Sequence, residues 1–106
     1  MPVCGLSRLM SQTIVCACVT GVDLILVWSD GRAVACERVC PHEQADLGLG
    51  HLSHGRLFCP RHAASFDLRN GQISYGWPSR SLRIYPVRIG DGQVWIDAGA
   101  IKSPAV

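Results

Sequence analysis

The first third of the chain alternates runs of apolar, often β-branched residues with short turn sequences. Residues 12–19 read QTIVCACV and residues 23–29 read DLILVWS, and the turn-forming TGVD joins them. A third run at 29–39, SDGRAVACERV, contains an Asp30-Gly31 turn of the kind that joins antiparallel strands. This pattern predicts a meander of antiparallel strands.

The last third repeats the alternation around two further turn signals. Asn70-Gly71 lies in RNGQISYG, and Asp91-Gly92 lies between two alternating segments of RIYPVRIGDGQVWID. A helical period of 3.6 residues is absent apart from one turn at LSRLM near the N-terminus. The eleven glycines and six prolines punctuate the chain at short intervals, which is typical of an all-β protein.

The interval from Val39 to Phe66 differs from the segments around it. It contains Pro41, Pro60, several glycines and all four histidines of the protein. Such residues favour turns and loops over strands. We therefore predict two loops joined by a short irregular connection and mounted on a β scaffold.

The size of the chain predicts a single domain over residues 1–106. With 106 residues and 48% hydrophobic residues, it can build only a modest core, which a metal or cross-link commonly supports. It has no apolar run of eighteen residues, and polar or turn-forming residues interrupt the N-terminal MPVCGLSRLMSQ. We therefore expect neither a membrane helix nor a secretory signal, and a cytoplasmic location.

The charge of the chain excludes one class of partner. The formal net charge is +2, and the basic residues are scattered along the sequence. A nucleic-acid-binding domain would carry a clustered basic stripe or a strongly basic balance. We expect no nucleic-acid partner.

Two short motifs contain the candidate metal ligands: CPH at 40–42 and CPRH at 59–62. The six cysteines could form three disulfides, but in a reducing compartment cysteines beside histidines are better explained as metal ligands. Two thiolates and two imidazoles suit either a tetrahedral zinc ion or a 2Fe-2S cluster. A zinc finger groups its cysteines in one pair and its histidines in another, whereas here each loop supplies one of each. Two facing loops can therefore give both cysteines to one iron and both histidines to the other.

This order of ligands, CxH followed after sixteen residues by CxxH, resembles that of the Rieske family. The resemblance continues along most of the chain, from residue 2 to about residue 97. PVCGLSRL is similar to the first strand and turn of bacterial Rieske ferredoxins, CPHEQADL and CPRHAASFDLRNGQ to their cluster loops, YGWPSRSLRIYPVRI to their proline loop and following strand, and DGQVWID to their final strand.

The resemblance implies a fold, a cofactor and four ligands. The fold would be all-β, with stacked antiparallel sheets and a small cluster-binding subdomain whose loops lie at about 39–66, next to a proline loop at about 76–80. The cofactor would be one Rieske-type 2Fe-2S cluster. Cys40 and Cys59 would hold one iron as thiolates, and His42 and His62 would hold the other through ring nitrogens.

The resemblance also implies a function. A Rieske-type ferredoxin passes single electrons from a flavin-containing NAD(P)H-dependent reductase to a terminal oxygenase, most often one that hydroxylates aromatic rings. The chain shows no carboxylate-histidine iron site and no dinucleotide fingerprint, so we expect a carrier without catalytic residues. The alternative is a small accessory subunit of a larger redox enzyme, such as a nitrite-reductase-type complex; a zinc-stapled binding module is the third possibility.

Four positions depart from the Rieske proteins of respiratory and photosynthetic complexes. Those proteins have two disulfide-forming cysteines, a serine and a tyrosine where this chain has Ala45, Arg61, Ala64 and Phe66. Without these hydroxyls and the disulfide, the reduced cluster is stabilised less. We expect a reduction potential toward the low end of the Rieske range of about −150 to +300 mV. Ser65 is the nearby hydroxyl, with a predicted role in capping the loop.

We expect structural rather than chemical roles for the remaining cysteines, histidines and tryptophans. We expect small buried hydrophobes at Cys4, Cys16, Cys18 and Cys36, solvated loop residues at His51 and His54, and packing residues at Trp28, Trp77 and Trp95. Charged residues from the loop segments are either scattered solvated groups or a basic rim that steers a docking partner: Arg38, Arg56, Arg61 and Arg80, with Glu43 and Asp46 as the nearby acids.

Overall fold

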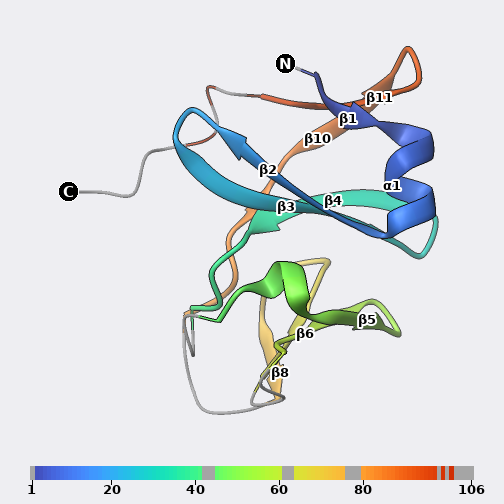
Figure 1. Ribbon diagram of the computed structural model, residues 1–106. Helices are drawn as coiled ribbons and strands as arrows, with labels where there is room; N and C mark the ends of the chain where they lie inside the picture. The colour runs from blue at the N-terminus through green and yellow to red at the C-terminus, as the bar shows by residue number, and fades with distance from the viewer. Residues whose placement is uncertain are drawn as a thin grey trace.

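The computed structural model describes residues 2–41, 45–60, 64–75, 80–97, 99 and 101. Within these residues the chain forms three antiparallel sheets, one α-helix and one 3-10 helix (Figure 1). The expected all-β class is therefore confirmed. The described part contains no helix long and apolar enough to cross a membrane.

The predicted meander forms the central sheet. Its strands are β2 (Ile14–Val19), β3 (Val22–Ser29), β4 (Arg32–Glu37) and the short β9 (Ile84–Tyr85), in the order β2-β3-β4-β9. Both residues of the turns Thr20-Gly21 and Asp30-Gly31 have positive φ. Two-residue turns of this kind match the right-handed twist of the strands that they join, so the local sequence sets both hairpins.

The second sheet joins the two ends of the described chain. It consists of β1 (Pro2–Gly5), β11 (Gln93–Ile96) and β10 (Val87–Gly90), in the order β1-β11-β10, with the predicted turn between β10 and β11. Between β1 and β2 lies α1 (Leu6–Gln12), which is longer than the single turn that the sequence predicts. Leu9 on this helix is fully buried, so tertiary packing stabilises a segment whose own helical signal is weak.

The third sheet corrects one prediction. The connection between the two predicted loops of residues 39–66 is not irregular, because it contains η1 (Leu47–Leu49) and a hairpin of β5 (His51–Ser53) and β6 (Arg56–Phe58). Two more strands, β7 (Ser65–Asp67) and β8 (Ile73–Tyr75), complete the sheet β5-β6-β7-β8. In Figure 1 this sheet forms a separate lobe beside the central sheet.

Two buried clusters fill the spaces on either side of the central sheet. Successive side chains of β3 alternate between them: Leu24 and Leu26 lie in the cluster shared with the β1-β11-β10 sheet, whereas Ile25 and Val27 lie in the cluster shared with the third sheet. The cluster that contains Ile25 and Val27 also contains the cysteines of the CPH and CPRH motifs. The candidate centre is therefore built onto a hydrophobic core.

The cysteines outside the CPH and CPRH motifs were predicted to be buried, and only some of them are. Cys36 is buried and Cys4 is partly buried, but Cys16 and Cys18 are exposed. The expectation of burial is wrong for this pair because β2 is the edge strand of its sheet, so that one side of the strand has no neighbour to cover it. All six cysteines lie in described segments, and none of them forms a disulfide there, which argues against the disulfide interpretation.

Candidate metal centre

Each cysteine predicted as a ligand begins a loop that the same kind of hydrogen bond closes. The Cys40 N–H donates to the Ala45 carbonyl at 2.9 Å, and the Cys59 N–H donates to the Ala64 carbonyl at 3.0 Å. Cys40 follows β4 and Cys59 follows β6. Two loops of equal length thus leave the ends of two strands, and each presents one thiol.

Cys40 and Cys59 are both completely buried, with 0% exposure, and belong to the same buried cluster. A buried apolar setting of this kind keeps water from a thiolate ligand. Their side chains would also satisfy the requirement of an iron-sulfur cluster for thiolate donors.

Charged side chains fix the first loop at its base. Arg38 donates from Nε to Asp46 Oδ1 and from Nη2 to Asp46 Oδ2, each at 2.9 Å. The same carboxylate accepts a hydrogen bond of 2.8 Å from the Gly48 N–H, and an isolated β-bridge pairs Val39 with Asp46. The hydrogen bond from Arg38 lowers the pKa of Asp46. This bidentate pair holds the two ends of the loop together.

Gly50 brings the two loop segments into contact. It follows η1, and a Cβ atom at this position would overlap the carbonyl oxygen of Phe58, the residue before Cys59. Its φ of −77° is ordinary, so close approach rather than backbone strain requires glycine here. The segment that leaves the first loop therefore packs directly against the strand that leads into the second.

Replacing Gly50 by alanine is expected to destabilise the protein by about 1–3 kcal/mol, the usual cost of forcing an extra group into a packed region. The shift should appear as a lower urea midpoint with an unchanged slope. Gly5→Ala is the matched control, because Gly5 also has a negative φ and a Cβ there meets nothing within 4 Å. Equal midpoints for the two variants would show that the two segments are not in close contact.

The histidines of both motifs lie outside the described residues. Of the segment expected to form the proline loop, only Arg80 is described. The described residues contain no group of three or more candidate metal ligands. The set Cys40, His42, Cys59 and His62 therefore remains a prediction. What the structure contributes is the matched pair of buried thiols, and these suit the sulfur half of the proposed ligand set.

A comparison with known families finds one family model that matches most of the chain. The family model described as the Rieske [2Fe-2S] domain matches residues 1–86. The chain belongs to the Rieske [2Fe-2S] family.

Several Rieske proteins are similar over most of the chain. The anthranilate 1,2-dioxygenase ferredoxin subunit of Burkholderia cepacia is 34% identical over 82 residues, 76% of each chain. The ferredoxin component of the naphthalene 1,2-dioxygenase system of Pseudomonas putida is 28% identical over 93 residues, 88% of this chain and 89% of the relative. The solved structure of the Sphingomonas yanoikuyae B1 ferredoxin has a TM-score of 0.83 at 26% identity, covering 92% of this chain and 96% of that one.

These matches confirm three expectations. The fold is that of Rieske ferredoxins, and the cofactor is one Rieske-type 2Fe-2S cluster rather than a zinc ion. The similar proteins are named as ferredoxin subunits or components, so the chain is an electron-transfer protein and not an enzyme by itself. Their names favour the carrier over the accessory-subunit alternative.

The chain departs at four positions from the Rieske proteins of respiratory and photosynthetic complexes, and the three of these positions that the structure describes are apolar. Ala45 and Ala64, whose carbonyls close the two loops, are 8% and 1% exposed, and Phe66 is fully buried. The expectation for Ser65 is wrong. It lies in β7, is 1% exposed, and its hydroxyl has no hydrogen-bond partner within the described segments, so it does not cap the loop.

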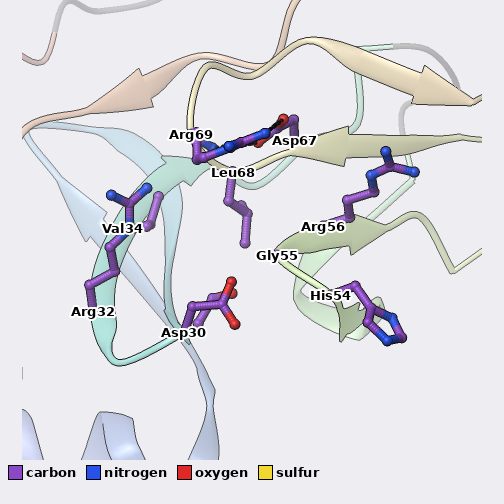
Figure 2. A pocket seen from close by; sticks show the side chains of 10 residues that line it. Asp30, Arg32, Val34, His54, Gly55, Arg56, Asp67, Leu68 and Arg69 are labelled. Carbon is purple, nitrogen blue, oxygen red and sulfur yellow. Dashed lines mark hydrogen bonds and ion pairs between the residues drawn. The ribbon is translucent and has the colours of Figure 1, made fainter.

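A cavity of about 490 Å³ lies at the opposite ends of the strands that lead to the Rieske loops (Figure 2). Asp30 and Arg32 line it at the start of β4, and Gly55 and Arg56 line it at the start of β6, whereas the two loops follow the far ends of these strands. Figure 2 shows Asp30 directed toward the β5–β6 turn. Arg56 therefore does not belong to a rim around the loops.

The other arginines of the expected basic rim are described only in part. Arg38 is paired with Asp46, and Arg80 with Glu37, whereas Arg61 and Glu43 lie outside the described residues. The structure therefore favours paired surface charges over a continuous basic rim. The Arg80–Glu37 pair has no local signal in the sequence, because its members are 43 residues apart.

The remaining histidines and tryptophans follow their predictions where they are described. His51 and His54 are exposed, although His51 lies in β5 rather than in a loop, and its ring stacks on Phe58 with centroids 4.8 Å apart. Trp28 packs against a buried cluster. Trp95 donates from its ring N–H to the Gly90 carbonyl at 2.8 Å, and Trp77 lies outside the described residues.

Proposed function

We propose that this chain is the ferredoxin component of a multicomponent oxygenase system in the cytoplasm. It would take single electrons from a flavin-containing, NAD(P)H-dependent reductase and deliver them to a terminal oxygenase that hydroxylates aromatic rings. The observation that carries the proposal is the pair of buried thiols in two identically closed loops, in a chain of the Rieske family. The similarity to ferredoxin components of two dioxygenases supports the choice of partner.

The chemistry of the proposed ligands suits a reversible carrier. When bound, a [2Fe-2S] cluster supplies a one-electron redox couple. Cys40 and Cys59 would hold it from the buried side as thiolates, while His42 and His62 would hold it as neutral imidazoles. The protein therefore contributes only two negative charges to the centre, and the buried cysteines exclude water from that side.

The first test is a metal count with two spectra. The purified protein is expected to be red-brown, to contain two irons and no zinc per chain, and to give a rhombic EPR signal of low average g after dithionite reduction. A colourless protein with one zinc that resists reconstitution with iron would contradict the proposal.

The second test addresses the partners. Candidate reductases and oxygenases from the same genome are expected to support NAD(P)H-dependent ring hydroxylation only when the loaded ferredoxin is added. The control is the same mixture with protein stripped of iron. If the loaded protein is reduced by a reductase but supports no oxygenase, the role of an accessory subunit would be favoured instead.

A further inference from the structure

An ion pair with a buried carboxylate lies next to the first cluster loop. Glu37 is the last residue of β4 and is only 8% exposed. Arg80 donates to it from Nη1 at 2.6 Å and from Nη2 at 2.8 Å, and the Arg83 N–H donates to the same carboxylate at 2.8 Å. The carboxylate thus has a bidentate guanidinium partner and a backbone donor, although it is almost removed from water.

Glu37 is near in sequence to the cysteine proposed to hold iron. Only three residue steps separate Glu37 from Cys40, so their Cα atoms are at most about 11 Å apart. Cys40 is completely buried, and Glu37 lies on the strand that leads to it. In such surroundings the effective dielectric constant is below that of water, so a charge on Glu37 is screened less than it would be in bulk solvent.

The two members of the pair differ in their contact with solvent. The Glu37 side chain is 11% exposed, whereas that of Arg80 is 48% exposed. Water therefore screens the guanidinium more than the carboxylate. An uncompensated Glu37 would act strongly on the cluster, and an uncompensated Arg80 would act more weakly.

We propose that Arg80 raises the reduction potential of the cluster by neutralising the buried carboxylate of Glu37. Reduction adds an electron to the cluster that Cys40 would hold, and a negative charge at the end of the strand that leads to Cys40 opposes that addition. With Arg80 in place, the pair presents a dipole instead of a net charge. The inference rests on the proposed cluster site, because it assumes that Cys40 is a ligand.

The test uses variants that remove one charge, the other, or both. Arg80→Gln leaves the carboxylate uncompensated and is expected to lower the midpoint potential. Glu37→Gln leaves the guanidinium uncompensated and is expected to raise it by a smaller amount. The double variant is expected to return to the wild-type value. Potentials would be measured by dye-mediated titration at low ionic strength and about pH 8, where carboxylates are ionised.

Opposite shifts distinguish an electrostatic role from a structural one, because loss of packing has no reason to reverse its sign with the charge removed. Shifts in the same direction, or a double variant that stays displaced, would overturn the proposal. Arg80→Lys keeps the charge without the bidentate contact, so it should stay near the wild-type potential even if Arg80→Gln does not fold.

Two measurements keep this test separate from that of the proposed function. Arg69→Gln breaks the pair with Asp67 at an arginine that is 79% exposed and should leave the potential unchanged; a shift as large as that of Arg80→Gln would show that overall charge, not this pair, sets the potential. Iron is counted in the wild-type protein first. A sample without two irons would refute the proposed function, whereas a loaded sample whose potential ignores both charges would refute only the role of the ion pair.

Discussion

Replacing Cys59 by serine is expected to give a colourless protein that has lost almost all of its iron. Iron-sulfur clusters are held by thiolates, and a serine hydroxyl stays protonated near neutral pH. Cys59 is completely buried, so solvent has little access to supply a replacement ligand. Iron content and visible absorption, measured after anaerobic purification, test this expectation.

The matched control for this variant is Cys18→Ser. Cys18 is an exposed thiol on the edge strand β2, so the same exchange there should leave two irons per chain and an unchanged spectrum. If Cys59→Ser also retained two irons and the wild-type spectrum, Cys59 would not be a ligand. Equal iron loss in both variants would point to a general sensitivity of the protein to thiol loss.

The second large effect is expected for His62→Cys. This change would give the iron that His42 and His62 are predicted to hold, here called the outer iron, a thiolate in place of a neutral imidazole, which adds negative charge to the centre. Histidine ligation is what raises Rieske potentials to about −150 to +300 mV, compared with about −400 mV for plant-type ferredoxins with four thiolates. The potential should therefore fall toward the plant-type value, and the EPR signal should lose its low average g.

His54→Cys provides the matched control for the histidine exchange. His54 is exposed in the β5–β6 turn, away from the loops that begin at Cys40 and Cys59, and its replacement should leave the potential and EPR signal unchanged. A wild-type spectrum in His62→Cys would contradict the ligand assignment. It would also require another residue to hold the outer iron.

Local sequence signals were sufficient for the scaffold. Apolar runs and the turns at Thr20-Gly21 and Asp30-Gly31 predicted the central meander, because both residues of such turns adopt positive φ, which glycine and a few polar residues tolerate. They were insufficient for the β5–β6 hairpin. Its turn is His54-Gly55, in which a histidine adopts a φ of 51°, a conformation that the sequence around it does not indicate.

The exposure of the cysteines shows a different limit. Cys16 and Cys36 both lie in apolar strand sequences, but one is exposed on the edge strand and the other is buried in an inner strand of the same sheet. Apolar sequence marks a strand and not its place in the sheet. That place depends on which strands pair, which is set by contacts between distant segments.

Residue order alone was sufficient to predict the family, the cofactor and the candidate ligands, because a metal centre needs particular atoms at a particular spacing and these are present in CPH and CPRH. Which charges near the loops are compensated follows only from the fold. Arg38 and Asp46 are paired across the first loop, and Arg80 reaches Glu37 from 43 residues away. Such pairs form when the folded backbone brings the side chains together, and residue order does not show where it does so.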